Sequence, residues 1–412
     1  MTAATNALGR ELQLVHAAQW LYAINAEPFV PGAGDPYARL VRGFEIGEKG
    51  TDGTDDAGGT LASIVERGPV WRSRLDTWVV TGPAALRELS AGAEPAVSAA
   101  VPQAEAWLPD PARQRTTELA RDLARRGGTR AVGKRAGSLR ERAGQAAARL
   151  GPGPVDLVAD FAEPLTAAGY AAILDVPEER RAAFAADLAA AAPAVDALLC
   201  PQTLDTTRRL AAGVRGLREL FAGHAHAEAD LVLAVAGARA AADLLGDALR
   251  RALDRPREWA LLRSDPAHAA RLVEEVLHHR PPWRACPLVA LSPAEVAGTR
   301  IEAGDTVTAV TTTTAVPAGT AGATEPAGAT EPGGASGPGE TAGASGFPTP
   351  LPVAACAALL PAARALAGHA LVALAARFPL LRPDGEPVRV RRAPLTRRLV
   401  RLPARLGEEE TR

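Results

Sequence analysis

A run of apolar residues at helical spacing restricts the fold more than any other feature of the chain. In residues 266–279 the apolar positions recur at i, i+3, i+4, i+7 and i+8, which places them on one face of a helix. They are Ala269, Leu272, Val273, Val276 and Leu277. Asp265 suits the cap of this helix, Pro266 suits its first turn, and Pro281 ends it. The segment therefore predicts an amphipathic helix that packs on a core.

Similar patterns along the chain predict further helices, joined by a few short strands. Helices are expected at 8–24, 83–89, 113–150 with a break at Gly127–Gly128, 178–200, 203–222, 224–253 and 353–377. Strands are expected at 78–80, 295–301 and 306–310 and in a hairpin of the tail after 387. We therefore predict a mainly α protein with a minor β-sheet, folded as a single large domain over residues 1–412.

Two segments lack the apolar residues that a folded element needs. Residues 47–60 are rich in Gly, Asp and Thr and predict a flexible acidic loop. Residues 315–346 are of low complexity, with AGATEP repeated from Ala321 and from Ala327. Such a composition buries too little apolar surface to offset the entropy of ordering. We expect a disordered insertion within the domain.

Charge and cysteine content exclude several classes of partner. The chain has 46 basic and 47 acidic residues and a net charge of −1, so no overall field attracts nucleic acid or anionic lipid. No signal sequence or long apolar run is evident, which predicts a cytoplasmic protein without a membrane anchor. The widely spaced Cys200, Cys286 and Cys356 do not suggest a disulfide framework.

Common catalytic and metal-binding motifs are missing from the sequence. It contains no G-x-S-x-G elbow, Walker loop or G-x-G-x-x-G fingerprint. His224 and His226 are two residues apart, so on a helix their rings would point about 200° from each other. Adjacent His278 and His279 are equally unsuited to share a metal ion. We therefore predict no catalytic residue, no metal site and no cofactor.

Several stretches, taken in order, resemble the soluble cytochrome P-450 monooxygenases. The resemblance lies in GPVWRSRLDTWVVTG from Gly68, SDPAHAARLVEEVLHHRPPW from Ser264, VAGTRIEAGDTV from Val296, ARALAGHALVALAARFPLLR up to Arg382, and PLTRRLVRLPARL from Pro394. These segments look like the family's first sheet, the helix and double proline after the oxygen-binding helix, a strand pair, the helix after the haem loop and the C-terminal hairpin. The resemblance implies the P-450 fold.

The residues that carry the family's chemistry are altered. Counting back from Arg377-Phe378-Pro379, the thiolate position falls at Ala357, next to Cys356, and the preceding PLPVAA lacks the family's glycines. Cys356 is therefore interpreted as a small core residue. We match the oxygen-activating signature, A/G-G-x-acid-Thr, to Ala222, Gly223, His224, Ala225 and His226. The acid and the threonine, which the family needs for proton delivery, are then missing.

Two further positions of the family concern structure and haem binding. The Glu-x-x-Arg pair is represented by Glu275 and His278, which still suit one hydrogen bond across i, i+3. Arg284 matches a position that often pairs with a haem propionate, but one arginine is not enough to hold the cofactor. The resemblance therefore implies an oxygenase scaffold without oxygenase chemistry.

A narrower resemblance rests on LGRELQLVHAAQWLYAINAEPF from Leu8, RSRLDTWVV and the degenerate haem region. Together they look like the P-450-derived auxiliary proteins of antibiotic glycosyltransferases. This implies a non-catalytic, haem-free protein that binds and stabilises or activates a glycosyltransferase attaching a deoxyamino sugar to a polyketide aglycone, in a hetero-oligomer. Its interface candidates, on an N-terminal helix apolar on more than one side, are Leu12, Val15, Trp20, Leu21 and Tyr22.

Three alternatives stay open at this stage. The N-terminal apolar residues suit packing on their own domain as well as on a partner. An atypical haem monooxygenase using Cys356 is a second functional hypothesis. The third is a carrier that holds an apolar aglycone in the former haem and substrate cavity.

Overall fold

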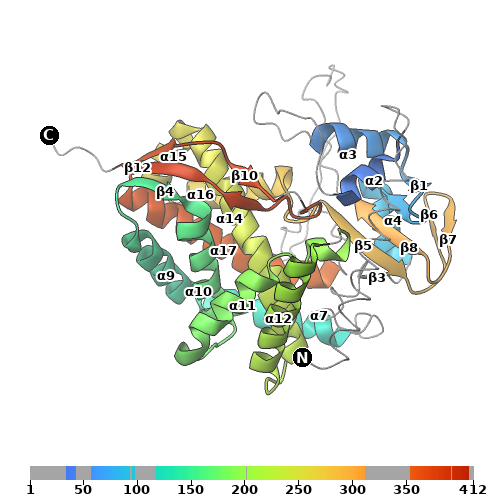
Figure 1. The fold of residues 1–412 in the computed structure, drawn as a ribbon, viewed down its shortest axis with the longest axis horizontal. Helices are drawn as coiled ribbons and strands as arrows, with labels where there is room; N and C mark the ends of the chain where they lie inside the picture. The colour runs from blue at the N-terminus through green and yellow to red at the C-terminus, as the bar shows by residue number, and fades with distance from the viewer. Residues whose placement is uncertain are drawn as a thin grey trace, which may run out of the picture.

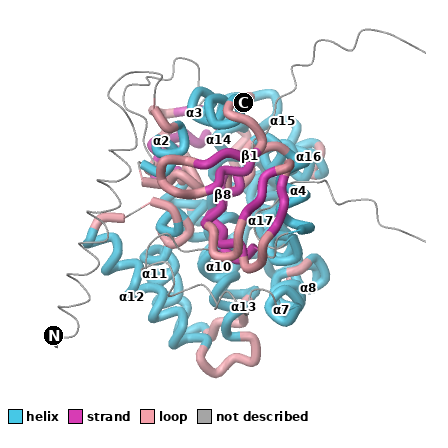
Figure 2. Tube along the Cα trace, turned by 90° about the vertical axis from the view of Figure 1, so that its right-hand side faces the viewer, coloured by secondary structure: helices cyan, strands magenta, loops and turns pink. Residues whose placement is uncertain are grey.

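The computed structural model describes residues 34–42, 57–92, 95–97, 117–200, 202–310, 353–390 and 392–407. Figure 1 shows a large helical part and, beside it, a smaller part built around a five-stranded sheet. Figure 2 looks from the side of that sheet, with the helices behind it and around it. The predicted fold class, mainly α with minor β-structure in one domain, is confirmed.

The helical elements account for most of the described chain. They are α2 (Pro36–Arg42), α3 (Ala57–Glu66), α4 (Pro83–Gly92), α7 (Thr117–Gly127), α8 (Thr129–Lys134), α9 (Ala136–Arg149), η1 (Leu157–Ala162), α10 (Glu163–Ile173), η2 (Glu178–Arg180), α11 (Arg181–Ala191), η3 (Asp196–Leu198), α12 (Leu204–Phe221), α13 (Ala227–Val232), η4 (Leu233–Gly237), α14 (Ala238–Asp254), α15 (Pro256–Ser264), α16 (Ala267–His279) and α17 (Val353–Arg377). Of these, η1 and η4 are π-helical and η2 and η3 are 3-10 turns.

Helix α16 forms as its apolar spacing predicts. The five apolar residues of its predicted face are all buried. Asp265 Oδ1 accepts a hydrogen bond of 3.0 Å from the backbone N–H of Ala267, which satisfies one donor of the first turn. At the other end the helix stops at His279, before the double proline.

Helix α17 runs through the centre of the helical part and packs against α7, α9, α14 and α16. Small residues allow this close approach: Ala362, Ala363, Ala367 and Ala370 are completely buried. By length and composition Leu359–Arg377 would pass for a membrane span, but half of that window is buried inside the protein. Its packing identifies it as a core helix.

The five-stranded sheet has the order β1-β2-β8-β5-β3. Its strands are β1 (Val70–Arg72), β2 (Trp78–Val80), β3 (Pro95–Val97), β5 (Ala285–Ala290) and β8 (Thr306–Val310). The β2 and β8 strands are parallel, and Trp78 Nε1 donates a 2.9 Å hydrogen bond to Asp305 Oδ2 beside this pair. Residues separated by more than 200 positions are thus joined at the sheet.

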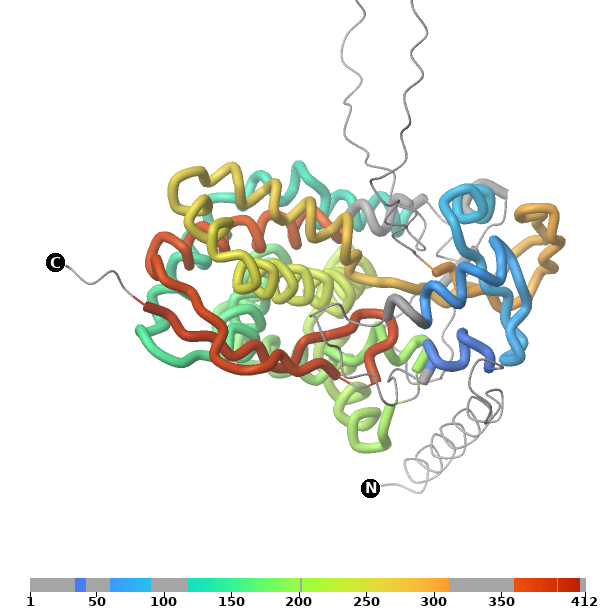
Figure 3. The backbone as a smooth tube through the Cα atoms, turned by 90° about the horizontal axis from the view of Figure 1, so that it is seen from above, coloured from blue at the N-terminus to red at the C-terminus, as the bar shows by residue number. Residues whose placement is uncertain are grey.

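The C-terminal strands lie along the helical part, as the red segment of Figure 3 shows. They are β9 (Leu380–Pro383), β10 (Val388–Arg389), β11 (Leu399–Arg401) and β12 (Pro403–Gly407), and β12 lies between β9 and β4 (Gly153–Asp156). The buried carboxylate of Asp196 accepts hydrogen bonds from the backbone N–H groups of Leu395 and Thr396 and from the Thr396 hydroxyl, at 2.6–3.0 Å. This one side chain anchors the turn before β11.

Several boundaries differ from the sequence predictions. Residues 57–60, assigned to the acidic loop, begin helix α3. The predicted helix 178–200 is interrupted, with α11 flanked by η2 and η3. The predicted strand 295–301 is a hairpin of β6 (Ala294–Val296) and β7 (Thr299–Ile301), turned by Ala297 and Gly298 at positive φ. Strands β3, β4, β5 and β9 and helices α2, α10 and α15 were not predicted. The predicted helix 8–24 and insertion 315–346 lie outside the described residues.

Replacing Asp196 with Ala is expected to lower the free energy of unfolding by about 3 kcal/mol, because two buried backbone donors and one hydroxyl lose their acceptor. Denaturant unfolding of the purified chain measures the change. Asp254→Ala is the matched control, since the Asp254 side chain is 63% exposed at a helix end. An equal, small effect of both substitutions would contradict the anchoring role of Asp196.

Candidate functional site

The longest continuous helical segment of the described chain runs through α13, η4 and α14, from Ala227 to Asp254. It precedes α15 and α16, so it corresponds to the oxygen-binding helix of the resemblance. Its π-helical turn η4 ends in Ala236 and Gly237. A Cβ atom at Gly237 would lie 2.9 Å from the Tyr170 hydroxyl of α10, so only glycine fits this approach.

The sequence analysis assigned the oxygen-activating signature to the wrong residues, Ala222–His226. Residues 222–226 form the turn between α12 and α13 and not part of the long helix. The Ala-Gly pair within the helix is Ala236–Gly237, and the signature continues through Ala238, Arg239 and Ala240. An Ala-Gly pair is a weak marker in a chain so rich in both residues. The π-turn of the long helix decides between the two pairs.

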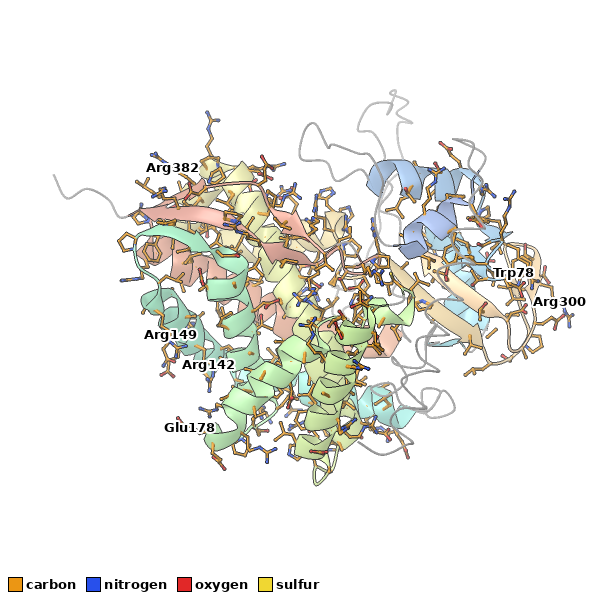
Figure 4. The ribbon with its side chains drawn as sticks, in the orientation of Figure 1. Trp78, Arg142, Arg149, Glu178, Arg300 and Arg382 are labelled. Atoms are coloured by element: carbon orange, nitrogen blue, oxygen red, sulfur yellow. The ribbon has the colours of Figure 1, made fainter. Side chains whose placement is uncertain are left out.

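The corrected alignment replaces the acid by Arg239 and the threonine by Ala240. Ala240 is 1% exposed and carries no hydroxyl. Arg239 is buried as well, and its guanidinium lies 2.8 Å from Asp243 Oδ1 and donates a 3.3 Å hydrogen bond to Glu163 Oε1. Exposed arginines behave differently, since Arg149, Arg300 and Arg382 point outward from the surface (Figure 4). At these positions too, the sequence has neither an acid nor a threonine.

Burial dominates the electrostatics around Arg239. Desolvation raises the pKa of Asp243 to about 6, although Arg239 acts in the opposite direction. Burial also disfavours the charged form of Arg398, in the turn before β11, and therefore lowers its pKa. The positive charge of Arg239 lowers it further. Asp196 belongs to the same group of charges, because its negative charge raises the pKa of both Asp243 and Arg398. The former oxygen-binding helix therefore carries an ionic cluster that reaches the C-terminal strands.

His224 and His226 lie beside different carboxylates. His224 Nδ1 lies 2.8 Å from Asp230 Oδ2, and His226 Nδ1 lies 3.1 Å from Asp122 Oδ2. Arg126 donates a 2.7 Å hydrogen bond to the same Asp230 carboxylate, which ties α7 to the start of α13. No group of metal-ligating side chains occurs within the described part of the chain.

The remaining family positions have structural partners. Glu275 accepts a hydrogen bond from Arg251 of the neighbouring helix α14. The His278 ring instead packs edge-on to His279. Arg284 Nε donates a 2.6 Å hydrogen bond to the Pro394 carbonyl. This contact ties Arg284, which matches the propionate-binding position, to the C-terminal segment.

The backbone at the matched thiolate position is helical. Cys356 and Ala357 lie within helix α17, which begins at Val353. The side chain of Cys356 is outside the described residues, as are Leu12, Val15, Trp20, Leu21 and Tyr22, so their predicted roles remain predictions. Cys200 and Cys286 are buried thiols, at 0% and 3% exposure.

Comparison with known proteins places this scaffold in a family. The chain is 32% identical to Protein TylM3 of Streptomyces fradiae, over 96% of this chain and 92% of the relative. It is 31% identical to Protein DesVIII of Streptomyces venezuelae, over 72% and 71%. The chain belongs to the family of P-450-derived auxiliary proteins. No protein-family model matches it.

The solved structures support the fold of this auxiliary protein. The open, histidine-tagged cytochrome P450 EryK from S. erythraea superposes with a TM-score of 0.65, at 19% identity, over 87% of this chain and 98% of that structure. Identity this low shows the fold alone. The P-450 fold implied by the sequence resemblance is therefore confirmed.

Replacing Arg239 with Met is expected to lower the free energy of unfolding by about 3–5 kcal/mol, because Asp243 then lacks its buried cation. The double change Arg239→Met with Asp243→Leu should recover most of this loss, since a buried pair replaced by apolar residues is often neutral. Denaturant unfolding measures both variants.

Arg208→Met is the control for loss of an arginine, because the Arg208 side chain is 64% exposed and lies 3.9 Å from Asp205. It should change the free energy of unfolding by less than about 1 kcal/mol. A double variant no more stable than Arg239→Met alone would refute the pairing of Arg239 with Asp243.

Proposed function

We propose that this chain is a non-catalytic auxiliary protein that binds and stabilises or activates a glycosyltransferase. That enzyme attaches a deoxyamino sugar to a polyketide aglycone of the macrolide or anthracycline type in antibiotic biosynthesis. The observation that carries the proposal is membership of the auxiliary family, at 32% identity over 96% of the chain. We further propose a hetero-oligomer in the cytoplasm, with neither nucleic acid nor membrane as a partner.

The altered helix supports the non-catalytic part of the proposal. Proton delivery in the oxygenases uses an acid and a threonine, and their positions here hold the ion-paired Arg239 and the buried Ala240. Arg284 donates to a backbone carbonyl. Cys356 lies within a helix and not in a loop that presents a thiolate to iron. These residues do not fit a haem-thiolate site, so we derive no oxygenase step.

Linkage explains how such a protein acts without chemistry of its own. A partner that binds only the active, folded form of an enzyme stabilises that form by about 2.7 kcal/mol at 100 times its dissociation constant. That free energy is a large fraction of the stability of a marginal enzyme. The effect needs a stable surface, and the packed helices around α17 supply a rigid scaffold for one.

We propose that the contact surface is formed by the residues predicted to be an N-terminal helix, 8–24. Its apolar residues occupy more than one side, which exceeds what packing on one core needs. The candidates are Leu12, Val15, Trp20, Leu21 and Tyr22. Substituting Leu21→Glu should weaken co-purification with the enzyme if this surface is correct, whereas Gln13→Glu should leave it unchanged.

Co-expression tests the proposed function directly. The glycosyltransferase of the same pathway, expressed with this chain, should co-purify with it and should be more soluble and more active than when expressed alone. The comparison is made at equal enzyme concentration, with and without the chain. An enzyme that is equally soluble and equally active without this chain would rule out the auxiliary function.

The absorption spectrum of the purified chain separates this function from the haem alternative. We expect no Soret band after expression with a haem precursor. A Soret band whose peak shifts in the reduced carbon monoxide form would identify a haem-thiolate protein and contradict the proposal. A Cys356→Ala variant would then show whether this sulfur is the ligand, because its spectrum would lose that shift.

A further inference from the structure

A cleft of about 290 Å³ lies between α10, α11 and the α13–η4–α14 helix. Its walls are mostly alanine, including Ala185 and Ala189 of α11 and Ala238 and Ala242 of α14, with Leu188 beside them. Small side chains on facing helices leave this space open. The volume is close to the lower end of known ligand pockets, at roughly 300 Å³.

Polar atoms without partners line this apolar cleft. Thr166 is 3% exposed, and its Oγ1 has no hydrogen-bond partner among the described residues. The Nε atom of Arg239, which is 7% exposed, also has none. The Tyr170 hydroxyl beneath Gly237 and both carboxylate oxygens of Asp243 are also without a hydrogen bond within the described chain, but these two residues do not line the cleft. Buried polar groups are rarely left unsatisfied, so an absent partner is indicated.

The chemistry of these groups defines the partner. Of the two unpaired groups that line the cleft, the Arg239 N–H can only donate and the Thr166 hydroxyl can donate, so a group that satisfies both is a hydrogen-bond acceptor. A negative charge is disfavoured, because Asp243 and Glu163 already compensate the guanidinium of Arg239. The acceptor is therefore a neutral oxygen, such as a ketone, on a body apolar enough for the alanine walls.

We propose that this cleft binds a small, neutral, apolar molecule through one carbonyl or hydroxyl oxygen, held by Thr166 and Arg239. The site lies between α10, α11 and α14, and this proposal does not rest on glycosyltransferase binding. Ordered water is the competing occupant, since water also accepts hydrogen bonds from buried donors.

The test measures the binding of the bicyclic ketone 2-tetralone to the full chain by isothermal titration calorimetry. The controls are tetralin, which lacks the oxygen, and tetralin-2-carboxylate, which adds a charge. Saturable binding of 2-tetralone, with both controls at least about tenfold weaker, is expected from the loss of one buried hydrogen bond or the burial of an unpaired charge. No saturable binding of 2-tetralone, as for a cleft that holds water only, would overturn the proposal.

Variants locate the binding in this cleft. Ala189→Leu fills it from an exposed position of α11 and should abolish binding, whereas Ala186→Leu, exposed on the same helix but outside the cleft, should not. Thr166→Val removes the hydroxyl at nearly constant shape and should weaken 2-tetralone about fivefold, with tetralin unchanged. Undiminished binding in Ala189→Leu would refute the site. Co-purification with the glycosyltransferase should be unaffected by all three variants, so the two proposals fail separately.

Discussion

The buried pair of Arg239 and Asp243 is the constraint on which the arrangement of the helical part depends. Two charges removed from water are tolerated only when each has a close partner. Asp243 therefore needs Arg239 at 2.8 Å, and Glu163 of α10 completes the contact. Arg398 and Asp196 extend the cluster to the turn before β11. Helix α10, the long helix and the C-terminal strands must consequently dock together.

This cluster also fits the proposed absence of oxygenase chemistry. The acid position of an oxygenase helix serves proton delivery. A buried arginine at that position is acceptable only if nearby carboxylates compensate its charge. Asp243, one helical turn away, does so. The same backbone position thus changes from a group that moves protons to one that holds helices in place.

Local signals predicted several helices, including α16 and α17, but they missed α2, α10 and α15 and gave no information on most tertiary contacts. The 3.6-residue spacing of α16 and the glycines that end α7 were sufficient, because these features act within one helix. Strand β5 was missed, since Ala285–Ala290 is buried on both faces and shows no alternation. The signature was misplaced at Ala222–His226 because five residues carry no information on which helix crosses the core. Partners such as Asp196 and Thr396, 200 positions apart, have no local signal at all.

The cleft beside η4 follows from the same departure from regular geometry. A π-turn inserts one extra residue, which shifts the register of the side chains that follow and leaves backbone and side-chain groups without their usual neighbours. Gly237 at this turn lets α10 approach closely, while the alanines of α11 and α14 leave space on the other side. The wall of this space then presents the unpaired Thr166 hydroxyl and Arg239 N–H, which are the two donors on which the proposed binding of a neutral acceptor rests.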